Sequence, residues 1–176
     1  MLDSNTQVYY FRWLSYHEHI FNYPDVGFVV TEFLPPVPWA GKYNTIPCAA
    51  GHHIAEGRWL RNRRIVNDYL RFWFRGGGDP RSYTFWVATA AWRKFEVDGN
   101  QTFVVDLLPD LVQNLYEWNT SHAVAFGAAG GMCFVQSDGA DGGELSISGA
   151  GCRPTINSAI VSDARAVADI AALLPA

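Results

Sequence analysis

Three carboxylates, Asp138, Asp141 and Glu144, lie close together in a glycine-rich stretch that runs from residue 137 to residue 158. Glycines allow sharp turns and close approach to a ligand, and a carboxyl group beside apolar walls has a raised pKa and can act as a general acid. Long polar loops that stay ordered are usually functional. We therefore predict acid–base chemistry for this loop. The alternative is a solvated acidic loop, because loops often carry Asp and Glu.

Two groups of residues combine aromatic rings with hydrogen-bonding side chains. The first contains Trp39, Lys42, Tyr43 and Asn44, and the second contains Arg81, Tyr83 and Trp86. A flat ring can stack beneath a sugar while polar groups bind its hydroxyls, so these groups predict sugar-binding surfaces. The alternative is that core aromatic side chains simply pin the two loops.

His52 and Glu56 stand four residues apart, so they share a face if this segment is helical. Such a pair is half of a metal site, but there is no His-Glu-x-x-His pattern and no third ligand can be identified. We predict no metal and no cofactor, and expect His52 and Glu56 to bind sugar hydroxyls or to make structural hydrogen bonds. The glycine clusters at 76–78 and 127–131 lack the features of a phosphate loop or a dinucleotide fingerprint.

Composition limits the class of protein. The 176 residues suit one domain, and aromatic residues make up 15% of the chain, which fits a ring-lined cleft. A net charge of −4 without a basic block argues against a nucleic-acid partner. No apolar run is long enough for a membrane span and no signal-peptide pattern is visible, so we predict no membrane partner and assign no compartment.

Three cysteines, Cys48, Cys133 and Cys152, are too few and too scattered to indicate a disulfide framework. A single bridge between Cys133 and Cys152 is conceivable. The sequence nevertheless favours free thiols.

Hydrophobic periodicity predicts six helices and few strands. The helices are expected at about 6–22, 46–58, 61–75, 83–98, 102–118 and 155–174, with a restart at Pro109 because proline is tolerated only in a first turn. Short strands are expected at 28–33, 132–136 and 144–147. Two apolar stripes on the third helix indicate burial against two neighbours. Since strands and helices do not alternate, the fold class is all-α, built from helical hairpins with the functional loops on one edge.

Four segments occur in an order that resembles one known family. They are residues 39–46 (Trp-Ala-Gly-Lys-Tyr-Asn-Thr-Ile), 50–59 (Ala-Gly-His-His-Ile-Ala-Glu-Gly-Arg-Trp), 80–86 (Pro-Arg-Ser-Tyr-Thr-Phe-Trp) and 149–158 (Gly-Ala-Gly-Cys-Arg-Pro-Thr-Ile-Asn-Ser). Together they resemble the mannosylglycerate-hydrolase-like glycoside hydrolase domain of the six-hairpin glycosidases. That superfamily is built as an (α/α)6 toroid, and the resemblance covers nearly the whole chain from about residue 8.

The resemblance implies inverting hydrolysis of an α-linked glucoside or mannoside by a carboxylic acid/base pair, with a carbohydrate as the substrate. Glu144 is similar in position to the general acid, with Asp141 as the second candidate. The resemblance also implies a pocket wall whose members are Trp39, Lys42, Tyr43, Asn44, His52, Glu56, Arg81, Tyr83, Trp86, Arg153 and Asn157.

Two departures from the family pattern stand out. Gly143 replaces a methionine expected before the acid, and Thr89 replaces an aspartate expected after Phe-Trp. About three of six hairpins are expected in residues 1–176, which we interpret as a single partial toroid without the catalytic base. The missing half, or self-association, is then a possible partner arrangement. The alternative is a catalytically inactive carbohydrate-binding or structural helical fragment.

Overall fold

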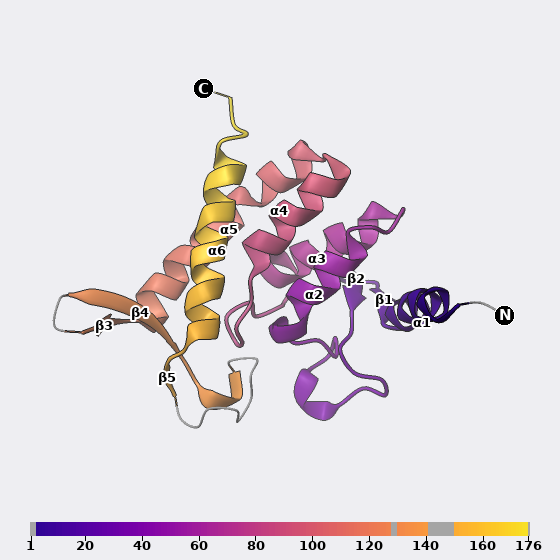
Figure 1. The fold of residues 1–176 in the computed structure, drawn as a ribbon, viewed down its shortest axis with the longest axis horizontal. Coiled ribbons are helices and arrows are strands. Elements are labelled where there is room, and N and C mark those ends of the chain that lie inside the picture. Colours follow the sequence, from indigo (N-terminus) through magenta and orange to yellow (C-terminus); the bar gives the residue numbers. More distant parts are fainter. Residues whose placement is uncertain (1–2, 128–129, 141–149, 176) are drawn as a thin grey trace.

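The structure, a computed structural model, describes residues 3–127, 130–140 and 150–175. Six α-helices and five short strands lie within this described part (Figure 1). The expected strand at 144–147 falls outside the described residues. The all-α class with helical hairpins and loops on one edge is confirmed.

The N-terminal segment differs from the expected single helix at 6–22. Helix α1 covers Ser4–Glu18, and the chain then forms a hairpin of β1 (Ile20–Tyr23) and β2 (Gly27–Val30). The turn between the strands contains Pro24 and ends at Gly27, whose φ of 78° suits glycine. Turn chemistry and the β-forming residues of this segment therefore prevailed over the helical spacing that had included Phe21.

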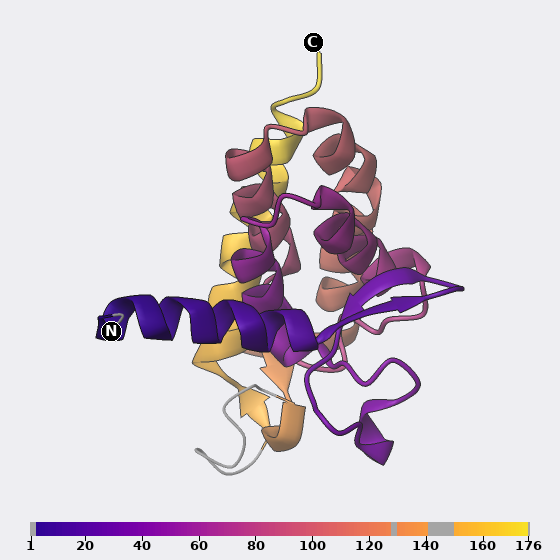
Figure 2. The same cartoon turned by 90° about the vertical axis from the view of Figure 1, so that its right-hand side faces the viewer.

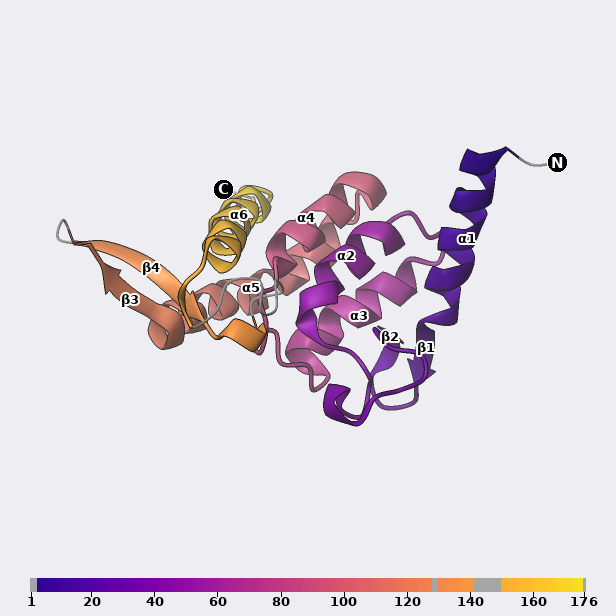
Figure 3. The ribbon, with the colours of Figure 1, turned by 60° about the horizontal axis from the view of Figure 1, so that its bottom comes forward.

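Helical hairpins form two layers. The inner layer contains α2 (Pro47–Gly57), α4 (Val87–Asp98) and α6 (Pro154–Ala171), in which α2 packs against α4 and α4 against α6. The outer layer contains α3 (Arg63–Arg75) and α5 (Gln101–His122). The three inner helices begin at the same edge of the molecule, so their first turns lie near one another (Figures 1 and 3). This is the arrangement of part of a helical toroid.

The expected restart of the fifth helix at Pro109 is wrong. Helix α5 runs through Pro109 without a break over 22 residues. The buried Leu107 and Leu111 hold it in the core on both sides of the proline. Arg75 of α3 also donates to the Asp106 carbonyl at 2.7 Å and pairs with the Asp110 carboxylate at 2.6 Å. Tertiary contacts therefore stabilise the helix where proline removes one backbone donor.

The main core is formed by α2, α3, α4, α5 and the second half of α6 together with β2. Its largest fully buried side chains include Trp73, Tyr69 and Phe85, and both apolar stripes of α3 are buried as expected. Helix α1 lies across the other helices, as the view in Figure 2 shows, and only its Tyr16 is buried. No described helix is long and apolar enough to cross a membrane.

A second sheet lies beside the start of α6. Strand β3 (Ala123–Phe126) pairs antiparallel with β4 (Gly131–Gln136), which pairs with the short β5 (Gly151–Cys152). A small core of Trp118, Ile156 and Ile160 connects this sheet to α5 and α6. Short 3-10 turns cover Pro38–Ala40 and Asp138–Ala140.

Candidate functional site

An open cavity of about 490 Å³ lies between α2, the residues that lead into α4 and the first turns of α6. Pro47 and Pro154 occupy the first turns of α2 and α6, where proline is pre-organised for a helix and its missing N–H costs nothing. The lining residues come from α2, from the segment that leads into α4 and from α6, and they are Cys48, His52, Thr84, Trp86, Pro154, Thr155, Ser158 and Ala159. We call this space the helix-terminus cavity.

The aromatic wall of this cavity depends on a glycine. The His52 and Trp86 rings meet edge to face, with centroids 5.2 Å apart. A Cβ atom at Gly51 would lie 2.4 Å from Cε2 of Trp86, so the ring packs directly on the backbone of α2. The Arg93 guanidinium lies 5.7 Å from the centre of the Trp86 ring. The Trp86 ring is therefore positioned from α2 and α4 together.

The two ends of the acidic loop lie beside this cavity. At one end the Thr84 amide, next to Trp86, donates to the Ala140 carbonyl at 2.9 Å. At the other end, Gly151 and Cys152 pair with Gln136 and Val135 of β4 immediately before α6 begins. Glu144 and Asp141 themselves lie outside the described residues, so their assignment stays a prediction.

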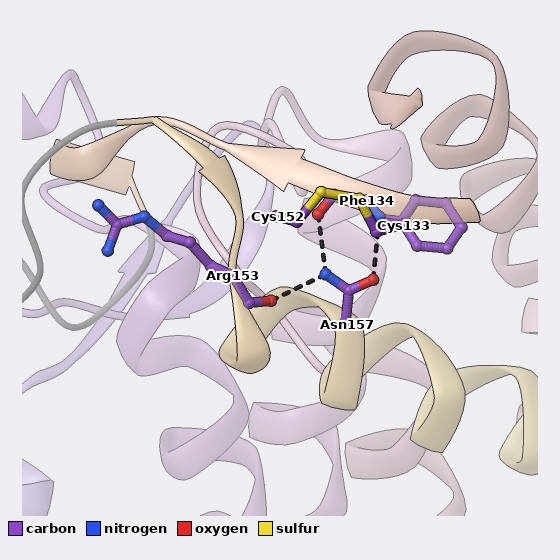
Figure 4. Close-up of a disulfide and its surroundings, with 5 residues drawn as sticks. All are labelled: Cys133, Phe134, Cys152, Arg153 and Asn157. Atoms are coloured by element: carbon purple, nitrogen blue, oxygen red, sulfur yellow. Dashed lines mark hydrogen bonds between the residues drawn. A yellow bond between two sulfur atoms is a disulfide. The ribbon is translucent and has the colours of Figure 1, made fainter. Parts of the chain in front are cut away.

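A disulfide and an asparagine hold the base of the loop (Figure 4). Cys133 and Cys152 are bonded, with Cα atoms 5.8 Å apart, so the expectation of free thiols is wrong for this pair, whereas Cys48 forms no disulfide. Adjacent strands had placed two distant cysteines within bonding range, which spacing alone could not reveal. The Asn157 amide accepts from the Phe134 N–H at 2.9 Å and donates to the Phe134 and Arg153 carbonyls at 2.8 Å.

Several residues that were expected to form the pocket wall make hydrogen bonds to the protein backbone or are buried. Asn157 makes the contacts just described, and Arg153 is 5% exposed at the start of α6. Asn44 is 3% exposed, accepts from the Val37 N–H at 3.1 Å and donates to the Phe33 carbonyl. A direct role for these three in sugar binding stays a prediction.

The first aromatic group forms a separate cavity of about 320 Å³, which we call the loop cavity. Trp39, Lys42 and Tyr43 line it, and Trp39 is 62% exposed. Lys42 and the Tyr43 hydroxyl both donate to the Asp25 carboxylate, the latter at 2.8 Å. The Lys42 bond, together with that of Tyr43, lowers the pKa of Asp25. Asp25 had not been identified from the sequence.

The second aromatic group is divided between cavities. Trp86 lines the helix-terminus cavity, and Tyr83 is half-buried in the segment before it. Arg81 faces another hollow of about 240 Å³, where it pairs with Glu117 at 2.6 Å and donates to Asn114 at 3.0 Å. Glu56 makes a two-bond ion pair with Arg12 of α1, at 3.0 and 3.1 Å.

A buried carboxylate connects α6 to α4 behind the cavity. Asp163 is 1% exposed, and its Oδ1 accepts from the Thr89 amide at 2.9 Å and from the Thr89 hydroxyl at 2.8 Å. Trp86, at the start of α4, has no capping side chain, so Asp163 supplies an acceptor to this terminus from another helix. Burial raises the pKa of Asp163 to about 7. The sequence could have indicated this buried residue, because Asp163 is a single carboxylate on the apolar helix face of Ile156, Ile160 and Ile170.

Metal ligands do not gather anywhere in the described part of the chain, where no group of three or more His, Cys, Asp or Glu side chains has suitable geometry. His53 is half-buried, desolvation lowers its pKa to about 4, and its Nδ1 lies 3.4 Å from the Tyr69 hydroxyl. His53 is therefore neutral near neutral pH.

A comparison with protein-family models shows to which family the chain belongs. Residues 42–130 match the model of the mannosylglycerate hydrolase MGH1-like glycoside hydrolase domain, which is more than half of the chain. The chain belongs to this family. The match includes α2, α3, α4 and α5, with the His52 and Trp86 side of the helix-terminus cavity. The protein therefore carries an MGH1-like glycoside hydrolase domain.

One solved structure is similar over nearly the whole chain. It is described as a sialidase, with 34% sequence identity and a TM-score of 0.88, and the alignment covers 98% of this chain. The same alignment covers 16% of the sialidase chain, so this MGH1-like chain spans about one sixth of that protein's length. A search of curated proteins gave no match.

Proposed function

We propose that the protein acts on carbohydrate by binding a sugar in the helix-terminus cavity as the acid-side half of a glycoside hydrolase site. The observation that carries this proposal is the convergence of three helix N-termini, the His52–Trp86 wall and both ends of the acidic loop at one cavity. The membership of the glycoside hydrolase family supports the same reaction class.

The cavity has the chemistry that sugar binding requires. Trp86 offers an aromatic surface, while His52, Thr84, Thr155 and Ser158 offer hydrogen-bonding groups around it. The first-turn N–H groups of a helix lack partners within that helix and can donate to hydroxyl oxygens. Their positive end also stabilises a carboxylate that has given up its proton.

The proposed reaction is inverting hydrolysis of an α-linked glucoside or mannoside. Glu144, or Asp141 as the second candidate, protonates the leaving oxygen, and a carboxylate roughly 6.5–9.5 Å away activates a water molecule on the opposite face of the sugar. We propose that residues 1–176 form one partial toroid and that the base comes from polypeptide outside them. The 16% coverage of the sialidase chain supports this arrangement.

Binding can be tested without altering the core. Ser158 is exposed on the cavity wall, so Ser158→Phe should fill the cavity and weaken binding of maltose and of α-1,2-mannobiose, measured by titration calorimetry. Val161→Phe, at a 53% exposed position outside the lining of this cavity, is the control. Equal affinities for the two variants and the wild type would place the sugar elsewhere.

Catalysis requires a separate measurement. We expect this chain alone to release little or no nitrophenol from aryl α-glucosides and α-mannosides, because both carboxyl groups must flank the scissile bond. Turnover that Glu144→Gln abolishes would contradict the half-site proposal.

A catalytically inactive carbohydrate-binding module is the second candidate. It is favoured by one observation: none of the described residues that line the helix-terminus cavity carries a carboxylate. A longer protein that includes neighbouring toroid hairpins distinguishes the two candidates. Sugar binding without hydrolysis by that protein would support the binding module.

A further inference from the structure

A second groove joins the helix-terminus cavity along α2. This space, the α1 groove, has a volume of about 420 Å³ and lies between α1 and α2. It is lined by Tyr9, Arg12, Trp13, His52, Ala55, Glu56 and Trp59. His52 lines both spaces, so its side chain lies between them.

The two spaces follow one face of α2 and its C-terminal turn. Cys48, His52, Glu56 and Trp59 recur every three or four residues, which places them in a row on one side of a helix. Eleven residues at 1.5 Å each give this row a length of roughly 16 Å. A row of this length exceeds a single sugar ring.

The walls of the α1 groove combine aromatic faces with a charged pair. Tyr9 and Trp59 are each 59% exposed, and the Trp13 ring meets the Tyr9 ring edge to face with centroids 6.4 Å apart. The side chains of Arg12 and Glu56 in their two-bond pair are 65% and 29% exposed. Rings for stacking and planar polar groups for hydroxyls are thus presented together.

The polar lining also argues for the kind of ligand. A protein helix that covered this groove would remove water from Arg12, Glu56 and His52 without replacing the hydrogen bonds that water makes, which is costly. Sugar hydroxyls replace those bonds while the ring faces contact Tyr9 and Trp59. An apolar partner therefore fits the groove less well than a carbohydrate does.

We propose that the α1 groove is a second sugar-binding subsite, so that the protein takes an oligosaccharide along α2 rather than a single sugar. This inference rests on the proposed function, because it extends the same site. It assigns roles to Tyr9, Arg12, Trp13 and Trp59, which lie beyond the helix-terminus cavity.

The test compares ligands of different length on the 176-residue chain. Affinities for maltose and maltotetraose, and for α-linked mannobiose and mannotetraose, are measured by calorimetry. Trp59→Ala should weaken tetrasaccharide binding about fivefold, roughly 1 kcal/mol, and leave disaccharide binding unchanged. Trp59→Tyr should restore most of the loss by keeping an aromatic face. Tyr116→Ala, at a 62% exposed position on α5, is the matched control.

The outcomes separate the two proposals. If Trp59→Ala binds the tetrasaccharides like the wild type while Ser158→Phe loses disaccharide binding, the subsite is wrong and the helix-terminus site stands. If no variant or wild type binds any of these sugars, the proposed function is wrong. Light scattering that shows a dimer dissociated by Trp59→Ala would overturn the subsite in favour of a second copy covering the groove.

Discussion

The helix-terminus cavity and the loop cavity are built in different ways. The walls of the first come from α2, α6 and the segment that leads into α4, and Asp163 and the Cys133–Cys152 disulfide hold its surroundings from distant parts of the chain. The second is lined largely by one loop, whose polar groups Lys42 and Tyr43 are already bonded to Asp25. Lys42 and Tyr43 are therefore engaged with a neighbouring carboxylate, whereas His52 and Ser158 on the wall of the helix-terminus cavity are exposed to solvent, which suits a ligand. The comparison therefore favours the first cavity as the sugar site.

The largest expected effect concerns Asp163. Its folded-state pKa of about 7 exceeds the ordinary aspartate value of 3.8, so between these pH values the folded protein binds a proton that the unfolded chain releases. The contribution of this proton to the free energy of unfolding is fully present below pH 3.8 and is lost as pH rises through 7. As pH rises from 4 to 8, the free energy of unfolding of the wild type, measured by urea denaturation, should fall relative to that of Asp163→Asn. The fall should reach up to roughly 4 kcal/mol.

The difference between the two proteins is the quantity to measure, because His53 acts in the opposite direction. Its folded-state pKa of about 4 lies below the ordinary histidine value of 6.5, so the free energy of unfolding increases as pH rises between those values. A difference that stays constant from pH 4 to pH 8 would show that Asp163 does not titrate in this range.

The disulfide should have the next largest effect. It closes a sequence separation of 19 residues, and removing a loop closure of this size costs about 3 kcal/mol. The variant Cys133→Ser with Cys152→Ser should therefore unfold at lower urea concentration than the wild type. It should also bind disaccharide more weakly, because Cys152 precedes the cavity wall at Pro154. Val161→Ser, at a 53% exposed position outside the cavity lining, leaves the disulfide intact and is the control. Equal stabilities of the double variant and the wild type would contradict the prediction.

A smaller effect is expected at Gly51, where a methyl group meets the Trp86 ring. Gly51→Ala gains about 1 kcal/mol of helix propensity, while overpacking against a ring costs 1–3 kcal/mol. The net destabilisation should be about 1 kcal/mol, with a change in the near-ultraviolet circular dichroism of the tryptophans. Gly139→Ala, where a Cβ meets no atom within 4 Å, should change neither quantity. An unchanged spectrum for Gly51→Ala would indicate that the Trp86 ring lies elsewhere.

The smallest effect is expected in the loop cavity. Asp25 is exposed, and exposed ion pairs contribute little to stability, so Asp25→Ala should leave the urea midpoint nearly unchanged. Disaccharide affinity should also stay at the wild-type value. A marked loss of binding in Asp25→Ala would reverse the comparison and make the loop cavity the sugar site.

Sequence reasoning located most helices but not every boundary. Periodic apolar residues predicted α2, α3 and α6 closely, since each buries a stripe of its own. It failed at β1, where turn chemistry outweighed helical spacing, and at Pro109, where packing of Leu107 and Leu111 preserved the helix.

The site was predicted in the same partial way. His52 and Trp86 were identified as wall residues, and the structure brings them together. Cys48, Thr84, Thr155 and Ser158 were missed, because small residues at helix starts carry no signal of their own. Asn44 and Asn157 were expected to face a ligand, and the structure shows their amides bonded to backbone groups. Their selection came from residue type, which does not reveal which groups already have partners.

The sequence by itself determined the helical periodicity, the glycine-rich acidic loop and the aromatic residues that a sugar could contact, because these depend on local spacing and side-chain chemistry. Only the tertiary structure decided which of them meet. Packing of α2, α4 and α6 brought residues 48, 86 and 155 to one cavity and buried Asp163 against Thr89, while pairing of β4 with β5 brought Cys133 to Cys152. Contacts between residues so distant along the chain follow from how helices pack, which no short pattern encodes.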